Sequence, residues 1–321
     1  MTTRPDLSVI IPVRNASATV VRLVKSFLAV DGIEVEVIAV DDASTDDSVE
    51  LVSALGDQRV RVERLDANYG AGVARNRGFA RAAGRYALFF DADDLIAPDA
   101  LLTAIEALDA TGADTAFTPY RYRRGEAGSF EGMHSYDHAV WSQYATRKRR
   151  LVDLTDVPRL LGFSNYPWNK LINSDHYRHT GLRFSSTPVH NDILGHWLTL
   201  LDARKLVLVD EPLCTHIVEA NGANLTNRRS RARLSLFDAL DETYDALEER
   251  PAMRQRYSHH YWSFALRVAD WARDRVALDA KEEFNLRLQT HLLRMDLADF
   301  ARMRARRDPT LASAVVRRVL A

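Results

Sequence analysis

Residues 86–101 read YALFFDADDLIAPDAL, and this stretch decides the fold. Its apolar start is typical of a strand that is covered on both faces. The run ends in three carboxylates, Asp91, Asp93 and Asp94, and Pro98 then favours the start of a helix, where proline is well tolerated. A buried strand that ends in clustered negative charge and leads into a helix predicts an α/β protein with a polar site at the end of the strand.

The same alternation of strand and helix extends over the first 120 residues. Helical spacing of apolar residues is clearest over 17–29 and 71–84. Short connections between alternating strands and helices predict a mainly parallel sheet with helices on both faces. The strands that we predict lie at 7–13, 35–42, 60–65, 86–91 and 114–118.

Two helix ends carry specific signals. Ser44, with Asp47 three residues later, fits a capping box at the start of a helix. The helix over 71–84 ends at Gly84, which we expect to be a left-handed glycine just after the helix.

In the rest of the chain the periodicity of apolar residues changes at two points. Residues 119–150 lose clean periodicity, and we predict loops with a short hairpin. From about residue 230 the pattern is helical, and such apolar stripes normally pack in a core or between helices. The residues of these stripes are Phe237, Leu240, Tyr244, Leu247, Tyr257, Tyr261, Phe264, Val268, Trp271, Phe284, Leu288, Leu292 and Met295.

Composition excludes several classes of protein. The 321 residues are 46% hydrophobic and 27% charged, which is typical of a soluble protein with a sizeable core. A formal net charge of -1 gives no field that would draw the chain to nucleic acid, and the single cysteine, Cys214, excludes a disulfide scaffold. No stretch nears the roughly 18 apolar residues that span a bilayer, and the N-terminus lacks the features of a signal peptide. We therefore expect a cytoplasmic protein, with peripheral contact at the inner face of a membrane left open.

Carboxylates also follow the second predicted strand, at Asp41 and Asp42. Ligands of open α/β sheets bind at the carboxyl ends of the strands. If the second and fourth strands are neighbours, these residues share one rim with Asp91 and Asp93, where four bare carboxylates would repel one another. A divalent cation removes that conflict, and oxygen ligands suit Mg²⁺ or Mn²⁺. We interpret three nearby aspartates as turn and helix-cap residues: Asp46, Asp47 and Asp99.

Three other kinds of site fit poorly. NYGAGVARNRG (68–78) contains G-x-G, but Arg75 stands where a dinucleotide-binding motif has its third glycine. DADDL (91–95) ends in leucine where the phosphatase motif D-x-D-x-T has threonine, and IIPVRNASAT (10–19) lacks the glycine of a nucleotidyltransferase phosphate loop. Glycosyl transfer from a nucleotide sugar remains, because a metal held by D-x-D neutralises the departing diphosphate.

In these motifs the chain resembles an inverting family 2 glycosyltransferase of the GT-A fold. The resemblance covers residues 8–102 almost without gaps and extends to about residue 226. It is carried by SVIIPVRN, VIAVDDASTDDSVELV, NYGAGVARNRGFARAAGRYALFFDADDLIAPDAL, PWNKLINSDHYRHTGLRF and HNDILGHW.

The resemblance implies a Rossmann-like α/β fold and a division of the chain into three parts. Residues 1–118 would form the nucleotide-sugar-binding half of the GT-A domain. Residues 119–226 would form the half that binds the acceptor and supplies the catalytic base. Residues 227–321 would form a helical C-terminal extension that serves acceptor binding, oligomerisation or docking to a membrane face.

The resemblance also assigns residues to the donor nucleotide and to the metal. Asp93 would bind the metal directly, Asp91 would face the ribose or the water shell of the metal, and His216 stands where many GT-A enzymes place a late histidine ligand. A single His beside Cys214 is not by itself a metal signature. The nucleotide-binding residues would be Pro12, Val13, Asn15, Asp41, Asp42, Asn68 and Asp91.

Asp192 stands where the family carries the acidic residue that acts as general base. Asn191 precedes it where relatives often have Glu. Asp192 also fits the N-terminus of a helix, ILGHWLTLL, and the positive end of the helix dipole would lower its pKa and keep it ionised. Both roles are compatible at one position.

Two further segments leave alternatives open. Trp168 would stack on a sugar or anchor the packing, and Lys170 would reach a phosphate or an acceptor anion. The segment TNRRSRAR (226–233) would form a basic lip over the diphosphate, although we favour a solvated helix start.

The resemblance as a whole implies transfer of a sugar from a nucleotide-diphospho-sugar, expected to be UDP-linked, with Mn²⁺ or Mg²⁺. The acceptor would be a glycan, a cell-envelope polymer or another hydroxyl compound. The alternative is a non-catalytic nucleotide-sugar-binding scaffold that kept the fold. A homo-oligomer formed through the C-terminal helices is left open.

Overall fold

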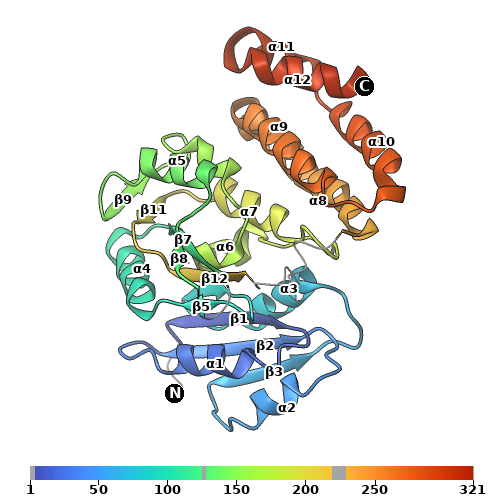
Figure 1. Ribbon diagram of the computed structural model, residues 1–321. Coiled ribbons are helices and arrows are strands. Elements are labelled where there is room, and N and C mark those ends of the chain that lie inside the picture. Colours follow the sequence, from blue (N-terminus) through green and yellow to red (C-terminus); the bar gives the residue numbers. More distant parts are fainter. Residues whose placement is uncertain (1–3, 125–127, 219–228, 321) are drawn as a thin grey trace.

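The structure is a computed structural model that describes residues 4–124, 128–218 and 229–320. Two sheets with their covering helices form the larger part, and a layer of helices completes the molecule (Figure 1). The predicted α/β architecture with a C-terminal helical region is therefore confirmed.

The larger sheet has eight strands in the order β3-β2-β1-β4-β10-β6-β11-β9. The first four strands are mutually parallel, whereas β10 is antiparallel to both of its neighbours and β9 is antiparallel to β11. The sheet is thus mixed and mainly parallel. Its strands are β1 (Leu7–Val13), β2 (Val35–Asp41), β3 (Val60–Arg64), β4 (Tyr86–Phe89), β6 (Thr115–Phe117), β9 (Arg149–Val152), β10 (Lys170–Asn173) and β11 (Leu206–Val209).

Strands β2 and β4 are not neighbours, because β1 lies between them and pairs with both. The condition under which we expected their carboxylates to share a rim, that the second and fourth strands are neighbours, is therefore not met. Both strands still run in the same direction as β1, so their carboxyl ends reach the same edge of the sheet.

Both faces of β1 are covered, which explains its uninterrupted apolar sequence. Val9 and Ile11 share one hydrophobic cluster with residues of α1 (Val20–Leu28) and α4 (Pro98–Thr111), and Ile10 shares another with residues of α3 (Ala71–Arg81) and α7 (Asp192–Leu201). Successive side chains of a strand point to opposite faces, so a strand buried on both sides needs apolar residues at every position.

A smaller four-stranded sheet, β5-β12-β7-β8, adjoins the first. The antiparallel pair β7–β8 is the predicted short hairpin. Helix α5 (Ser135–Tyr144) lies within residues 119–150, so the prediction of loops is wrong for this part. The strands of this sheet are β5 (Leu95–Ile96), β7 (Tyr120–Arg124), β8 (Phe130–Glu131) and β12 (Cys214–Val218).

The α-helices are α1 (Val20–Leu28), α2 (Ser48–Ser53), α3 (Ala71–Arg81), α4 (Pro98–Thr111), α5 (Ser135–Tyr144), α6 (Ser174–Thr180), α7 (Asp192–Leu201), α8 (Leu236–Glu248), α9 (Pro251–Arg273), α10 (Lys281–Leu292), α11 (Leu297–Arg302) and α12 (Pro309–Leu320). The shorter turns are η1 (Pro158–Gly162), η2 (Pro167–Asn169), η4 (Arg231–Ser235), η5 (Leu278–Ala280) and a π-helical turn, η6 (Met303–Arg307).

Both predicted helix-end signals are wrong. Helix α2 begins at Ser48, and the Ser44 hydroxyl instead accepts the N–H of Asn15 at 3.0 Å. Helix α3 ends at Arg81, and Gly84 has no left-handed backbone. A Cβ at Gly84 would lie 2.6 Å from the backbone nitrogen of Ser8, so contact with β1 explains this glycine.

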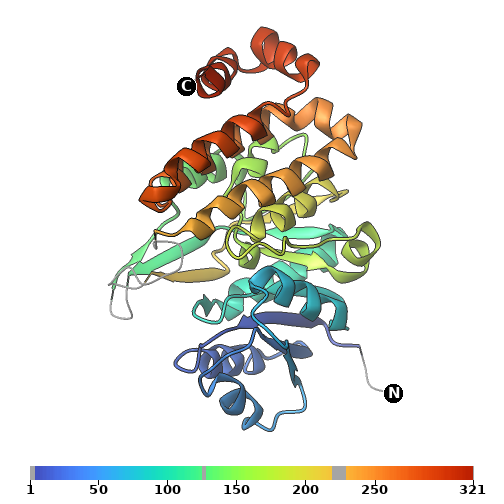
Figure 2. The ribbon, with the colours of Figure 1, turned by 90° about the vertical axis from the view of Figure 1, so that its right-hand side faces the viewer.

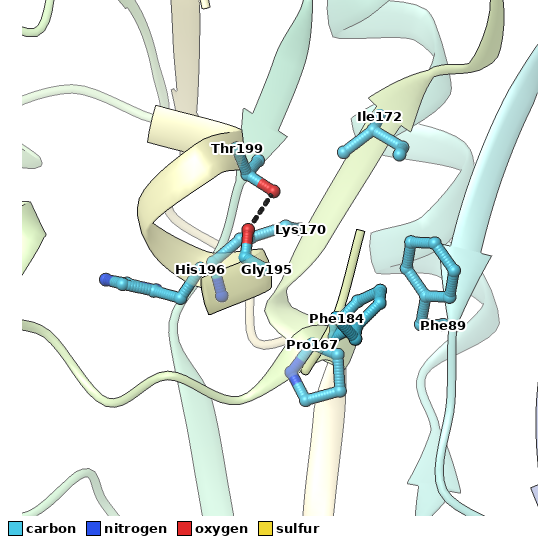
Figure 3. Close-up of a pocket in the computed structure, with 8 residues that line it drawn as sticks. All are labelled: Phe89, Pro167, Lys170, Ile172, Phe184, Gly195, His196 and Thr199. Atoms are coloured by element: carbon cyan, nitrogen blue, oxygen red, sulfur yellow. Dashed lines mark hydrogen bonds between the residues drawn. The ribbon is translucent and has the colours of Figure 1, made fainter. Parts of the chain in front are cut away.

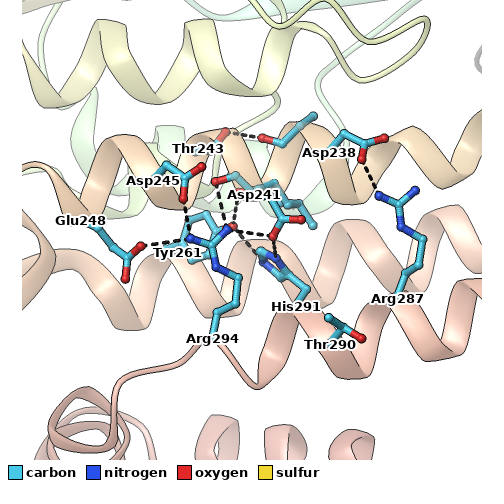
Figure 4. Close-up of polar contacts among 12 residues, drawn as sticks. Asp238, Asp241, Thr243, Asp245, Glu248, Tyr261, Arg287, Thr290, His291 and Arg294 are labelled. Carbon is cyan, nitrogen blue, oxygen red and sulfur yellow. Dashed lines mark hydrogen bonds and ion pairs between the residues drawn. The ribbon is translucent and has the colours of Figure 1, made fainter.

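The C-terminal helices pack through the stripes that the sequence predicts. Phe237, Leu240, Tyr244 and Leu247 of α8 are buried and belong to the same hydrophobic core as the sheet. Charged contacts tie the outer α10 to α8: Arg287 pairs with α8, and Arg294 pairs with three of its carboxylates (Figure 4). Among the described residues, no helix is both long and apolar enough to cross a membrane. The predicted boundary at 226/227 lies outside the described residues.

Candidate active site

The carboxyl ends of β2 and β4 bring the predicted donor-site residues to one rim. Asp41 is the last residue of β2, and Asp91 lies two residues beyond the end of β4. Asp41 and Asp42 are buried. The two oxygens of Asp42 accept the backbone N–H groups of Tyr69 and Gly70, at 2.7 and 2.9 Å. Asp42 thus fixes the entry to α3, and a carboxylate with about four lone-pair sites keeps further accepting capacity.

The loop after β1 lies against the loop after β2. Asn15 has a left-handed backbone (φ 49°), and its side-chain oxygen accepts the backbone N–H of Thr45 at 2.8 Å. Val13 is buried and Pro12 is partly exposed beside it. Asn68 is exposed on the approach to α3. The predicted nucleotide-binding residues therefore flank one edge of the sheet.

Arg75 of α3 joins the two halves of the site. Its guanidinium donates to Asp91 Oδ1 and to Asn191 Oδ1, each at 2.7 Å. The side chain of Arg75 is buried and lies over the ring of Phe184, 5.4 Å from the ring centroid. A buried arginine with two charge-assisted hydrogen bonds is held rigidly, so the D-x-D segment and the residue before Asp192 are linked directly.

Asp192 is the first residue of α7, and Asn191 precedes the helix. Burial raises the pKa of the Asp192 carboxyl, while the charges of Arg75 and Lys170 act in the opposite direction. Our expectation that the helix dipole would leave this pKa lowered is wrong, because the surrounding protein outweighs it. A carboxyl with a raised pKa that sits at a rim is a candidate proton acceptor.

The remaining D-x-D carboxylate, Asp93, is exposed, and its neighbour Asp94 is buried. The surrounding protein atoms, followed by the charges of Asp94 and Asp91, raise the pKa of Asp93 to about 7. Crowded carboxylates of this kind favour binding of a cation.

His216 lies on β12, and its Nδ1 donates to Asp94 Oδ1 at 2.8 Å. Burial opposes protonation of the ring, but the Asp94 carboxylate outweighs it and raises the pKa of His216 to about 9. Asp94 also accepts the backbone N–H of Ile217 at 2.9 Å. Asp94 therefore orients His216 toward the rim, a role that our sequence analysis did not give it.

Trp168 is fully buried and stacks on Tyr166, with ring centroids 4.4 Å apart. It has no exposed face for a sugar, which favours the packing role. Tyr166 is partly exposed, and its hydroxyl lies 3.0 Å from that of Tyr122. The ring of His216 is 5.6 Å from Tyr166, so aromatic side chains line the space beside the rim.

Lys170 is buried and its ammonium donates to Asn169 Oδ1 at 2.7 Å and to the carbonyl of Tyr166. Burial lowers the pKa of Lys170 to about 7, although the charge of Asp192 raises it. Lys170 lines a small interior pocket with His196 (Figure 3). This placement favours a structural cation behind the site over the predicted contact with a phosphate or an acceptor anion.

The described part of the segment TNRRSRAR, residues 229–233, leads into η4, and the exposed Arg229 and Arg231 agree with the solvated helix start that we favour, whereas Arg233 departs from it. Arg233 is buried, and its guanidinium lies over the ring of Trp271, 5.2 Å from the centroid. Arg231 is exposed and pairs with Asp279 and Glu283. Residues 226–228 lie outside the described residues.

The residues that we predict as metal ligands do not form a complete metal site within the described part of the chain. Within the described residues, no three His, Cys, Asp or Glu side chains are arranged as a metal site. Magnesium-type ions in phosphate-transfer sites usually take one or two carboxylates together with substrate phosphates. Asp93 and Asp91 are carboxylates of this kind, and their role as ligands together with His216 stays a prediction.

Comparison with known proteins bears on the family and the fold of the chain. The model of the family described as Glycosyl transferase family 2 matches residues 8–176, just over half of the chain. The succinoglycan biosynthesis protein ExoO of Rhizobium meliloti (strain 1021) is 45% identical over 112 residues, which are 35% of this chain and 32% of that protein. The uncharacterized glycosyltransferase YibD of Escherichia coli (strain K12) is 26% identical over 287 residues, 84% of this chain and 79% of that protein. Several of the similar curated proteins are thus matched over less than half of their length.

A crystal structure of S. aureus TarS 1-349 in complex with UDP-GlcNAc has the same fold. It superposes with a TM-score of 0.73 over 98% of this chain and 88% of that chain, at 17% sequence identity. A second structure of the same fragment, in complex with UDP, gives a TM-score of 0.72. The likeness shows that the fold is of the predicted GT-A type and includes the C-terminal helices.

Proposed function

The chain belongs to glycosyl transferase family 2 and is a glycosyltransferase, and we propose that it transfers a sugar from a UDP-sugar with inversion, aided by a divalent cation. The observation that carries the proposal is the Arg75 bridge between Asp91 and Asn191, at 2.7 Å on each side. It unites the rim that suits a nucleotide diphosphate with the start of α7, where Asp192 stands.

The donor would lie along the edge formed by the loops after β1 and β2. Asp42 and the loop at Asn15 would hold the base and ribose, with Asp41 and Asn68 beside them. The solved complexes of TarS with UDP and with UDP-GlcNAc support a uridine donor for this chain.

Asp93 would bind Mn²⁺ or Mg²⁺ directly, with Asp91 and His216 as further ligands. When bound, the ion would neutralise the charge that develops on the departing diphosphate. Asp93 with its raised pKa would become ionised as the cation binds, since opposite charge stabilises the carboxylate.

Asp192 would accept the proton of the acceptor hydroxyl as that oxygen attacks the anomeric carbon. Inversion requires attack from the face opposite the diphosphate, so the base belongs to a different segment from the D-x-D. Arg75 would hold Asp91 and the start of α7 at a fixed separation, and its charge lowers the pKa of Asp192 toward the ionised form.

The acceptor would bind beside Tyr166 in the second half of the domain, residues 119–226. The similarity to a succinoglycan biosynthesis protein supports a glycan or cell-envelope polymer as acceptor. The first half, residues 1–118, would hold the donor, and residues 227–321 would complete the molecule as a helical extension.

The direct test compares wild-type protein with Asp192→Asn. UDP release from a panel of UDP-sugars is measured with Mn²⁺ and a broad set of sugar acceptors, and donor binding is followed by thermal shift. We expect Asp192→Asn to bind UDP normally and to lose about 10²- to 10⁴-fold in transfer rate.

Asp31→Asn, at an exposed position away from the rim, should behave as wild type. Donor binding by wild-type protein without turnover on any acceptor would favour the non-catalytic scaffold. Unchanged transfer by Asp192→Asn would remove Asp192 from the mechanism.

A further inference from the structure

The outermost helices carry positive charge that is not paired within the part of the chain that the structure describes. Residues 297–320 contain six arginines and two aspartates. Arg302 pairs with Asp299, and Arg318 pairs with Asp270. The other four arginines are exposed, and no carboxylate of the described residues lies within ion-pairing distance of them; they are Arg304, Arg306, Arg307 and Arg317.

This concentration distinguishes the region from the helices beneath it. Arg250 pairs with Asp202, and Arg287 and Arg294 pair with carboxylates of α8. These arginines are thus neutralised locally, whereas the three arginines of η6 and Arg317 of α12 are exposed. Exposed like charges repel one another unless an anionic partner is present.

Exposed apolar side chains occur in the same region. Among the described residues, ten large apolar side chains are exposed, and six of them lie between residues 278 and 320. Leu293 (69% exposed), Leu297 (84%) and Leu320 (80%) lie at or beside the ends of α10, α11 and α12. Exposed leucines combined with arginines are typical of helices that lie in the interface of a bilayer.

Both ribbon views place α11 and α12 at the end of the molecule opposite β1–β3 (Figures 1 and 2). This end is therefore free to meet a flat surface without covering the candidate active site at the sheet rim. We propose that η6, α11 and α12, with the neighbouring end of α10, dock onto an anionic lipid bilayer.

The positive charge of this surface favours an anionic bilayer over a second copy of the chain as its partner. In a two-fold dimer the same patch faces itself, so the unpaired arginines of one copy would meet those of the other. An anionic bilayer instead offers phosphate groups to every guanidinium, and arginine binds phosphate in a two-pronged geometry. The leucines add apolar contact just below the headgroups.

The test is sedimentation of the full chain with two kinds of vesicle, pure phosphatidylcholine and phosphatidylcholine mixed with phosphatidylglycerol. We expect binding to the mixed vesicles, weak binding to the neutral ones, and loss of binding as salt is raised. Reversing three charges, in Arg304→Glu/Arg306→Glu/Arg307→Glu, should lower binding at least about a hundredfold, since each arginine near such a surface contributes about tenfold or somewhat less.

The matched control is Lys25→Glu/Arg61→Glu/Lys148→Glu, which makes the same change in net charge at exposed positions outside the helical region. It should bind the mixed vesicles nearly as wild type does. Leu293→Ser/Leu297→Ser should weaken binding at high salt more than at low salt. UDP-sugar turnover without vesicles should be unchanged in all three variants.

Equal binding to neutral and anionic vesicles, or unchanged binding by the triple arginine variant, would overturn the proposal. So would a concentration-dependent dimer, seen by analytical ultracentrifugation without vesicles, that the triple arginine variant abolishes; that result would assign the surface to a second copy.

Discussion

At the scale of single residues, Arg75 organises the candidate site. It is one of the few charged side chains in the core, and its two strong hydrogen bonds connect segments that are 116 and 16 residues away in sequence. Its charge also lowers the pKa of Asp192, against the larger effect of burial. Arg75 therefore affects both the shape and the proton affinity of the site.

Replacing Arg75 by leucine should shift the pH dependence of transfer. Without the positive charge the pKa of Asp192 rises further, so the ionised base forms only at higher pH. The acidic limb of kcat/KM should move to higher pH, and kcat/KM near neutral pH should fall by at least about tenfold. The measurement is a pH–rate profile with saturating metal.

Arg77→Leu is the matched control, because Arg77 lies on the same helix but pairs with Glu63 at the surface. Its profile should follow wild type. An Arg75→Leu profile with reduced height and an unmoved acidic limb would mean that Arg75 acts by packing alone.

The sequence predicted which residues lie at the rim better than it predicted the hydrogen bonds that link them. Asp41, Asp42, Asp91 and Asp192 could be found because strand ends and a family resemblance mark them. From the sequence we interpret Arg75 only as the residue that is incompatible with a dinucleotide-binding motif. Its position was nevertheless informative: it shares the apolar stripe of α3 with Gly72 and Phe79, and a charged residue in such a stripe needs a buried partner.

At the scale of elements, the close packing of α3 fixes the site. The helix lies against the segment that leads to α7, where Asn76 exchanges two hydrogen bonds with the backbone of Phe184, at 2.8 and 2.9 Å. A Cβ at Gly72 would lie 1.9 Å from the carbonyl oxygen of Ser185. Gly72, part of the G-x-G that resembles a nucleotide-binding loop, thus permits close contact between two protein segments.

Gly72→Ala should therefore be destabilising. Backbone atoms cannot move aside as a flexible side chain can, so we expect a loss of about 1–3 kcal/mol in unfolding free energy, or more, together with reduced transfer. Urea unfolding measures the first and UDP release the second.

Gly132→Ala is the control, since a Cβ there meets nothing within 4 Å and the backbone is not left-handed. It should change stability by less than about 0.5 kcal/mol. Wild-type stability of Gly72→Ala would show that α3 is free to move away from its neighbour.

The predicted boundaries of elements are wrong where two local sequence signals compete. Ser44 had a capping partner in sequence, but its hydroxyl serves the loop at Asn15, and Asp46 accepts the backbone N–H of Ser48 at 3.1 Å at the start of α2. Contacts between loops of different strands decide these ends, and such contacts are not visible in one stretch of sequence.

At the scale of the whole molecule, one hydrophobic core joins the sheet to the C-terminal helices. The order of the sheet could not be predicted, because it depends on which strands pair after long connections. The helical region could be predicted from periodicity alone. Its attachment depends on polar groups such as Asp241, which accepts from His291 Nδ1 at 2.7 Å and from Arg294 at 3.0 Å (Figure 4).

Asp241→Asn should lower stability in a pH-dependent way. Burial raises the pKa of Asp241, but the hydrogen bonds and charges of His291 and Arg294 outweigh it, and the net pKa is lowered. A lowered folded-state pKa gives stability that is present above the unfolded pKa of about 3.9 and is lost as the pH falls through the folded pKa. Because the side chain is 40% exposed, we expect a loss of only about 1 kcal/mol near neutral pH.

Urea unfolding at neutral pH and below about pH 3 measures this difference. Asp274→Asn, an exposed substitution at the end of α9, should have little effect at either pH. A loss for Asp241→Asn that is equal at both pH values would assign the effect to packing instead of charge.

The central claim is that the rim carboxylates hold a divalent cation beneath the diphosphate of the donor. Calorimetric titration of UDP tests it most directly, with Mn²⁺ and with chelator, on wild type, Asp93→Asn and the exposed control Asp99→Asn. The account predicts that Mn²⁺ strengthens UDP binding at least about tenfold in wild type and in Asp99→Asn, and that Asp93→Asn loses this gain. A gain from Mn²⁺ that is as large in Asp93→Asn as in wild type would contradict it.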